Sequence, residues 1–202
     1  MTEAVVIGVS AGGLKALSVI APMLPKDLLF PVIVVQHVKE GSDPYMAEHL
    51  GRNSVIRVKE ADEKESVKAG TMYFAPAGYH LLVETDRTFS LSDEPPVQFS
   101  RPSIDVLFES AADVYGAALA GVVLTGANSD GAAGLAAIKD AGGTVAVQDP
   151  ETAESSAMPN AALKAAKTDN VFDLVGIGSF LCDLNMKSTA EHLKTDKEWS
   201  IL

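Results

Sequence analysis

Runs of apolar, β-branched residues alternate along the chain with segments whose apolar residues recur every three or four positions. The first run, 4–9, is apolar apart from one glycine, which is the pattern of a strand buried on both faces. A helical pattern starts at residue 13 and ends before Pro22. Residues 31–36 form a second apolar run. Two such strands joined by a helix make a right-handed βαβ unit, so the pattern predicts a parallel sheet.

The rest of the chain follows the same alternation, with one interruption. Between 59 and 100 the runs become short and are separated by turn residues, which predicts a hairpin or antiparallel edge formed by 71–75, 80–84 and 88–91. Other strands are expected over 55–58, 119–124 and 144–147, and helices over 44–50, 104–115, 131–141, 159–166 and 179–184. We predict one doubly wound α/β domain over 1–186, with a mostly parallel sheet, helices on both faces and a short antiparallel insertion. Residues 187–202 are predicted to form a polar tail.

Composition narrows the class of protein. Of the 202 residues, 47% are hydrophobic and 21% charged, which argues against intrinsic disorder. Lys and Arg number 16 and Asp and Glu 27, and the resulting net charge of −11 argues against nucleic-acid binding and against an anionic membrane surface. The single cysteine, Cys182, excludes an internal disulfide, and no apolar run reaches the ~18 residues of a membrane span. We therefore expect a soluble, cytoplasmic protein.

Three residues suited to nucleophilic catalysis follow predicted strands. Ser10 follows the first strand, His37 the second, and Asp130 comes after the strand at 119–124. Because the carboxyl ends of parallel strands meet at one edge of a sheet, a nucleophile, a base and an orienting carboxylate are expected there. Residues 8–12 also match the G-x-S-x-G string of a nucleophile elbow.

Each of the three residues also has a structural interpretation. Ser10 and Asp130 could each cap the helix that follows, and a lone histidine such as His37 is more often structural than catalytic. The chain lacks the glycine pattern of a dinucleotide site and the Gly-Lys-Ser/Thr of a phosphate-binding loop, and its other histidines have no metal-ligand spacing. No cofactor or metal is therefore predicted.

Six segments carry motifs of one known family, in that family's order between residue 4 and about residue 184. They are IGVSAGG at 7–13, VVQH at 34–37, APAGYH at 75–80, SRPSIDVLF at 100–108, LTGANSDGAAGL at 124–135 and the block 141–159. With these segments, the chain resembles the catalytic domain of the chemotaxis receptor protein-glutamate methylesterase family (CheB type).

The resemblance implies a Ser–His–Asp triad at Ser10, His37 and Asp130. It also implies that the backbone N–H groups of Ala11 and Ala127 form the oxyanion hole. The implied partners are methylated receptor helices (methyl-accepting chemotaxis proteins). On them the enzyme hydrolyses glutamate methyl esters, releases methanol and, as a related activity, deamidates glutamine.

The chain departs from the family pattern beside the proposed site. Ala11 stands where the family commonly has threonine, and Ala127-Asn128 replaces a common Met-Gly. We interpret these changes as an altered pocket shape, because the triad is intact. Two other functions stay open, namely a binding module without catalysis and a general hydrolase of small esters. Since the first strand begins at Ala4, we expect no receiver domain ahead of it.

The negative net charge also bears on docking. An acidic receptor helix would be repelled by the overall field of the protein, so recognition is expected to need a local basic patch. Lys15, Lys39 and Arg101 are the candidates, because they are expected near the predicted site.

Overall fold

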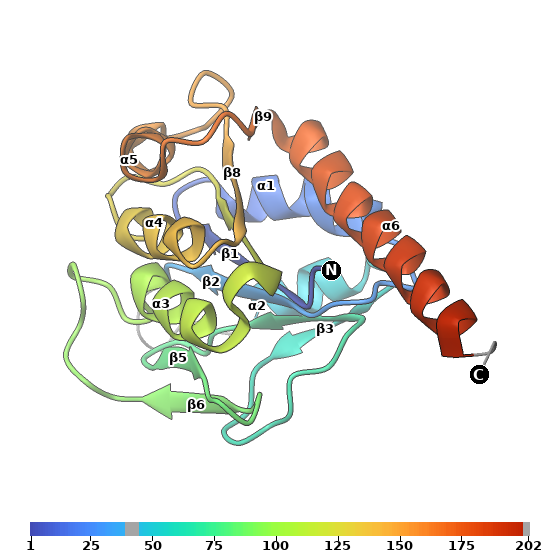
Figure 1. Ribbon diagram of the computed structural model, residues 1–202. Helices are drawn as coiled ribbons and strands as arrows, with labels where there is room; N and C mark the ends of the chain where they lie inside the picture. The colour runs from blue at the N-terminus through green and yellow to red at the C-terminus, as the bar shows by residue number, and fades with distance from the viewer. Residues whose placement is uncertain (39–44, 200–202) are drawn as a thin grey trace.

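The sheet at the centre of the molecule is parallel throughout. The computed structural model describes the backbone of residues 1–38 and 45–199 and the side chains of residues 1–38 and 46–190. Within these ranges, seven strands pair in the order β3-β4-β2-β1-β7-β8-β9 (Figure 1). Their bounds are Ala4–Val9 for β1, Val32–Gln36 for β2, Arg57–Glu60 for β3, Thr71–Phe74 for β4, Leu119–Val123 for β7, Thr144–Gln148 for β8 and Val171–Phe172 for β9.

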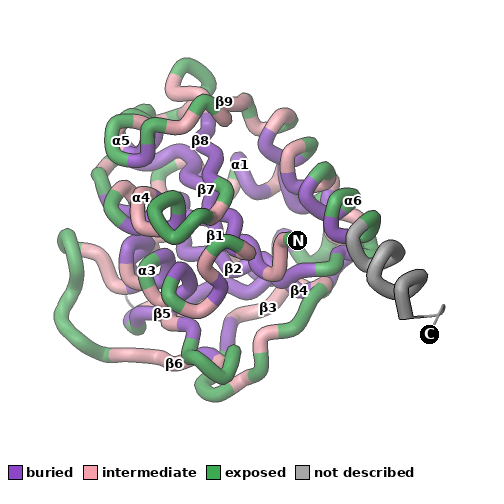
Figure 2. The backbone as a smooth tube through the Cα atoms, viewed as in Figure 1, coloured by how far each residue is buried: buried purple, intermediate pink, exposed green. Residues whose placement is uncertain are grey.

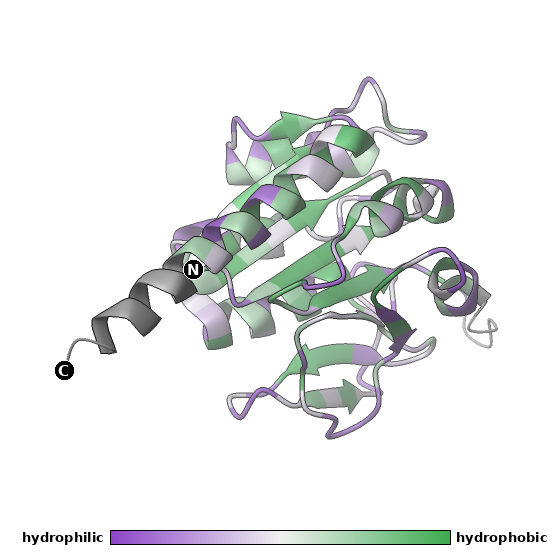
Figure 3. Ribbon diagram, turned by 90° about the vertical axis from the view of Figure 1, so that its right-hand side faces the viewer, coloured by the Kyte–Doolittle hydropathy of each residue, from purple (hydrophilic) through white to green (hydrophobic). Residues whose placement is uncertain are grey.

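Helices cover both faces of this sheet. On one face lie α3 (Ile104–Tyr115), α4 (Ala132–Asp140) and α5 (Ala157–Ala166), and on the other lie α1 (Gly13–Ile20), α2 (Tyr45–Gly51) and α6 (Leu174–Trp199). Short 3₁₀ turns, η1 (Ala21–Met23) and η2 (Gly116–Ala118), follow α1 and α3. Side chains of β1 alternate between the two cores, with Val6 in one and Ile7 in the other. The central strands are therefore buried on both faces (Figure 2) and hydrophobic along their length (Figure 3).

A second sheet is antiparallel and has two strands, β5 (His80–Val83) and β6 (Phe89–Ser92), which lie beside α3. The predicted fold class, a doubly wound parallel sheet with a small antiparallel insertion, is confirmed. The prediction that 71–75 belongs to the insertion is wrong. This run forms β4, which pairs in parallel with β2 and β3. All four of its residues are buried, as an interior strand requires.

Two further differences concern strands at the edges of the sheet. The third strand begins at Arg57 and not at Val55, which is 62% exposed and contributes nothing to either core. The two-residue strand β9 was not predicted, because Val171–Phe172 is too short to stand out as a strand in the sequence.

The last helix is much longer than the predicted 179–184. α6 runs through Lys187 to Trp199, so residues 187–199 of the predicted tail continue the helix, and the rest of the predicted tail lies outside the described residues. Two polar side chains of α6 are buried in the fold. Asn185 Oδ1 accepts a hydrogen bond from the backbone N–H of Leu29 (2.8 Å), and Ser188 Oγ accepts one from the N–H of Thr2 (3.2 Å). Polar residues of α6 thus pack against the rest of the fold, although their polarity favours an exposed tail.

The chain leaves β1 in one direction and β7 in the other. From β1 it crosses through α1 to β2, and from β7 it crosses through α4 to β8 on the opposite side. In open α/β sheets, ligands bind at the carboxyl ends of strands where this reversal occurs. The loops after β1, β2 and β7 are therefore where a site is expected.

Candidate active site

Ser10 occupies the turn between β1 and α1. Gly12, with a φ of 81°, is the N-cap of α1, and no side chain caps this helix. The interpretation of Ser10 as a helix cap is therefore wrong. Its backbone is held instead: Ser10 N–H donates to the carbonyl of Thr125 (2.9 Å), and its carbonyl accepts from Gly13 N–H (2.9 Å) and Gln36 Nε2 (3.0 Å). The hydroxyl makes no hydrogen bond to any residue that the structure describes.

His37 and Asp130 are in direct contact. The distance from His37 Nε2 to Asp130 Oδ2 is 2.7 Å. The parallel register pairs Val9 of β1 with Gln36 of β2. Ser10 and His37 are the residues that follow these two, so they lie next to each other at the ends of neighbouring strands. The structure therefore brings two of the three candidates together and places Ser10 beside them, with no hydrogen bond from Ser10 Oγ to the imidazole.

Asp130 is fully buried and caps a helix, though not the helix that follows it in the chain. α4 has Gly131 as its N-cap and no side-chain cap. The carboxylate accepts instead from the first N–H groups of α3: Ile104 N–H reaches Oδ2 (2.7 Å) and Asp105 N–H reaches Oδ1 (3.0 Å). Ser103 Oγ donates to Oδ1 as well (2.9 Å). Burial by itself would raise the pKa of Asp130, but the bonds from His37 and from α3 outweigh it, so this pKa is lowered.

Two residues that the sequence did not single out support this carboxylate. Ser103 is fully buried and is the N-cap of α3. Its backbone N–H donates to His80 Nδ1 (3.1 Å), while His80 Nε2 lies 3.3 Å from the carbonyl of Pro95. Since Nδ1 accepts, Nε2 is the ring nitrogen that can donate to this carbonyl. Both residues lie in the family motifs. Their contacts join segments that are far apart in the sequence, so no periodic pattern of hydrophobic and polar residues indicates their role.

Asp105 is a second buried carboxylate in contact with the site. It is 4% exposed, and its own N–H donates to Asp130. Oδ1 accepts from Gly134 N–H (2.7 Å) and Oδ2 from Gln98 Nε2 (2.7 Å). Burial, together with the neighbouring charge of Asp130, raises the pKa of Asp105 to about 6. Two neighbouring carboxyl groups therefore differ in acid strength: the pKa of Asp130 is lowered and that of Asp105, on α3, is raised.

The loops of the two expected oxyanion donors are fixed to each other. Thr125 Oγ1 donates to the carbonyl of Ala11 (2.8 Å), and the carbonyl of Thr125 accepts from Ser10 N–H. Ala11 and Ala127 are both exposed. Among the described residues, neither of their backbone N–H groups has an acceptor. Both groups are therefore available to a bound oxyanion.

Asn128 fits its position without backbone strain. In the described part of the chain, it is not among the non-glycine residues with a positive φ. Its Oδ1 accepts from Asp130 N–H (3.3 Å), and its Nδ2 donates to Ser100 Oγ (3.4 Å). Replacing the family's glycine here thus ties the loop of Asp130 to the segment around residue 100.

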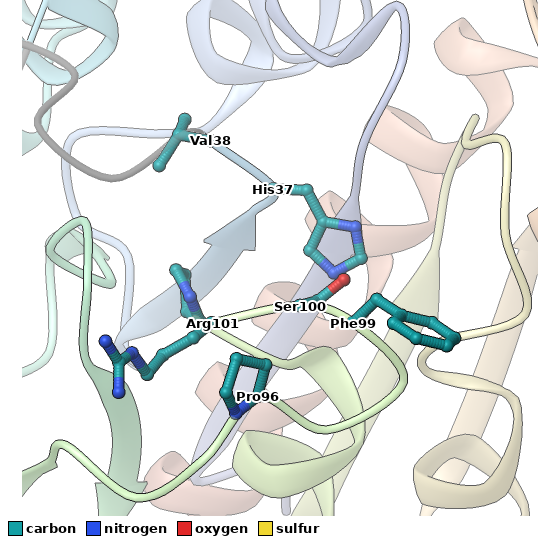
Figure 4. Close-up of a pocket in the computed structure, with 7 residues that line it drawn as sticks. His37, Val38, Pro96, Phe99, Ser100 and Arg101 are labelled. Atoms are coloured by element: carbon teal, nitrogen blue, oxygen red, sulfur yellow. The ribbon is translucent and has the colours of Figure 1, made fainter.

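A cavity of about 440 Å³ opens beside the imidazole (Figure 4). It is lined by His37, Val38, Pro96, Phe99, Ser100, Arg101 and Pro102. Of the predicted basic patch, Arg101 is therefore at the cavity, where its Nη1 donates to the carbonyls of Asp93 and Glu94. Lys15 is exposed on the first turn of α1. Lys39 lies outside the described residues.

The fold and the site together define a class: doubly wound α/β proteins with a serine-bearing turn and a histidine–carboxylate pair at the sheet's switch point. This arrangement is typical of enzymes that activate a serine nucleophile. Residues 5–181 match the model of the CheB methylesterase family. The chain belongs to this family.

Known relatives agree with this assignment. A protein of Leptospira interrogans with the provisional name protein-glutamate methylesterase/protein-glutamine glutaminase is 50% identical over 186 residues, which are 92% of this chain and 96% of the relative. A protein-glutamate methylesterase/protein-glutamine glutaminase of Clostridium acetobutylicum is 42% identical over 84% of this chain and 49% of its own length. The crystal structure of the Thermotoga maritima CheB methylesterase catalytic domain superposes with a TM-score of 0.87 at 35% identity, covering 91% of this chain and 99% of that domain.

Proposed function

We propose that this chain is a protein-glutamate methylesterase that hydrolyses glutamate methyl esters on chemotaxis receptors in the cytoplasm and also deamidates receptor glutamine. The observation that carries the proposal is the 2.7 Å hydrogen bond between His37 Nε2 and Asp130 Oδ2, directly beside Ser10 in a member of the CheB methylesterase family. None of the helices, over their described residues, is both long and apolar enough to cross a membrane.

In the proposed reaction, Ser10 Oγ attacks the ester carbonyl while His37 takes the hydroxyl proton. Because Nε2 faces Asp130, Nδ1 is the nitrogen that receives this proton. Asp130 stays ionised, since its pKa is lowered, and it stabilises the imidazolium that forms. The N–H groups of Ala11 and Ala127 bind the oxyanion of the tetrahedral intermediate.

The intermediate collapses when His37 returns its proton to the departing methoxide, which leaves as methanol and forms an acyl-enzyme at Ser10. His37 then deprotonates a water molecule that attacks the acyl group, and Ser10 Oγ is released with its proton restored. A free glutamate side chain remains on the receptor. For a glutamine substrate the leaving group is ammonia, and the remaining steps are the same.

The decisive experiment measures methanol release from a membrane preparation of the organism's own methylated receptors. We expect release by the wild type and its loss in Ser10→Ala. Ser18→Ala is the matched control, because Ser18 lies on α1 and, within the described part of the chain, its Oγ bonds only the carbonyl of Leu14 (2.7 Å). Equal release by the wild type and Ser10→Ala would refute the proposal.

Two further readouts separate the alternatives. A fluorophosphonate probe should label Ser10, whereas a binding module without catalysis would stay unlabelled. Turnover of small p-nitrophenyl esters with indifference to receptor would instead indicate a general esterase.

A further inference from the structure

Two residues that line the cavity, Phe99 and Ser100, belong to a tight turn made by residues 97–100, which we name the Phe99 turn. Val97 and Ser100 exchange backbone hydrogen bonds of 3.1 Å and 2.8 Å, so the two residues between them close a two-residue hairpin. Gln98 and Phe99 adopt φ values of 47° and 65°. Such turns favour glycine, asparagine and aspartate at these positions, because other side chains strain the left-handed backbone.

The strained turn is held in place by the site itself. Gln98 Nε2 donates to Asp105 Oδ2 (2.7 Å), and Gln98 Oε1 accepts from Ser129 Oγ (2.9 Å). Asn128 Nδ2 adds a bond to Ser100 Oγ (3.4 Å). The Phe99 turn is therefore attached to the two residues that precede Asp130 and to Asp105 on α3, which fixes its position relative to the catalytic pair.

Phe99 contributes nothing to the packing of this chain. Its relative exposure is 103%, the highest of the exposed large hydrophobic side chains in the described part of the protein. Yet it lines the same cavity as His37, together with Pro96 and Pro102 (Figure 4). A strained backbone that presents a bare aromatic ring at the rim of a site indicates a ligand contact, since aromatic anchors dominate binding surfaces.

We propose that Phe99 contacts the receptor segment that carries the glutamyl methyl ester and packs against an apolar side chain beside that glutamate. The inference rests on the proposed function. Because the cavity is continuous with His37 and has the volume of a small-molecule site, it holds more than one ester side chain. Arg101 is the one charged side chain among the cavity's described lining residues besides His37, and its Nη1 donates to the carbonyls of Asp93 and Glu94. Beside Phe99 the wall is formed by Pro96 and Pro102, so an aliphatic receptor side chain fits there. Phe99 then favours protein substrates over small esters.

The test compares Phe99→Asn with the wild type on two substrates. Asparagine tolerates the left-handed backbone, so the turn is retained while the ring is lost. We expect kcat/KM for methanol release from methylated receptor membranes to fall about tenfold, equivalent to about 1.4 kcal/mol. Hydrolysis of a p-nitrophenyl ester should stay within about twofold, because the catalytic pair is untouched. Phe99→Leu, which keeps an apolar contact, should retain more receptor activity than Phe99→Asn.

Met186→Gln is the matched control, because Met186 is 61% exposed on α6 and lines no part of the cavity. It should change neither rate. Unchanged receptor turnover in Phe99→Asn would overturn the inference, and an equal fall on both substrates would overturn it too, since the ring would then act on the catalytic geometry. If the wild type releases no methanol from receptors, the proposed function fails and the inference fails with it. If the wild type releases methanol from receptors and Phe99→Asn does so at the same rate, the proposed function stands and only the inference about Phe99 is overturned.

Discussion

Replacing Asp105 by asparagine should stabilise this protein in a pH-dependent way. Burial raises the pKa of Asp105 from 3.8 to about 6, and the charge of Asp130 adds to this rise. A carboxyl group with a raised pKa in the folded state stabilises the fold fully only while it is protonated, below the unfolded pKa. That contribution is lost as the pH rises from 3.8 to about 6. The rise corresponds to about 3 kcal/mol lost above about pH 7.

Asparagine has the shape of the protonated acid and does not pay this cost. Its Oδ1 can accept from Gly134 N–H, and the amide of Gln98 can turn over so that its oxygen accepts from the new Nδ2 and its nitrogen donates to Ser129 Oγ. We therefore expect Asp105→Asn to raise the free energy of unfolding at about pH 8 by about 2–3 kcal/mol. The gain at about pH 4.5 should be smaller by about 2 kcal/mol, because the wild-type carboxyl is then mostly protonated.

Urea denaturation of both proteins at the two pH values measures this difference directly. Taking the variant minus the wild type cancels the carboxylates that do not interact with Asp105. A difference that does not change with pH would refute the argument, because it would show that Asp105 is not ionised at a cost in the fold. Methanol release should persist in the variant, since Asp130 keeps its bonds to His37, Ser103 and Ile104.

Two other substitutions test how the site is built. Ser103→Ala removes one donor to Asp130 Oδ1, so the free energy of unfolding from urea denaturation should fall by about 1.5–3 kcal/mol and methanol release should slow; unchanged values of both would show that Ser103 does not support the carboxylate. Gly13→Ala places a Cβ against Gln36 Oε1 and so displaces the side chain that bonds the carbonyls of Ser10 and His37. It should cost about 1–3 kcal/mol and most of the activity. Gly51→Ala, whose Cβ would lie an ordinary 3.6 Å from Val58 Cβ, should do neither.

The sheet could be predicted because its strands are buried on both faces. The runs that became β1, β2, β7 and β8 are mostly apolar, with polar residues only at the ends of β2 and β8, which is the pattern a two-sided core imposes. β4 was assigned to the wrong sheet, since four residues bounded by turns look alike in parallel and antiparallel pairings. The predicted last helix is too short, because Asn185 and Ser188 are buried through hydrogen bonds to Leu29 and Thr2, and a hydropathy pattern does not indicate such burial.

The site was predictable as far as strand ends could be located. Ser10, His37 and Asp130 each follow a strand, so one edge of one sheet gathers them. The partner of Asp130 was not predictable from its neighbours. Its sequence position favours a cap on α4, but the carboxylate turns to the N-terminus of α3, a helix that starts 26 residues earlier at Ile104. Contacts between elements distant in sequence carry no local signal, so the roles of Ser103 and His80 emerged only from the structure.

One residue that departs from the family pattern, Asn128, connects the loop of Asp130 to the Phe99 turn. Asn128 stands where glycine is common. Its side chain bonds both Asp130 N–H and Ser100 Oγ, and glycine has no side chain to make these bonds. Ser129, the next residue, bonds Gln98. The same short loop therefore positions the carboxylate that orients His37 and the turn that presents Phe99. A further substitution at Asn128 is therefore expected to shift both the Phe99 turn and the His37–Asp130 pair.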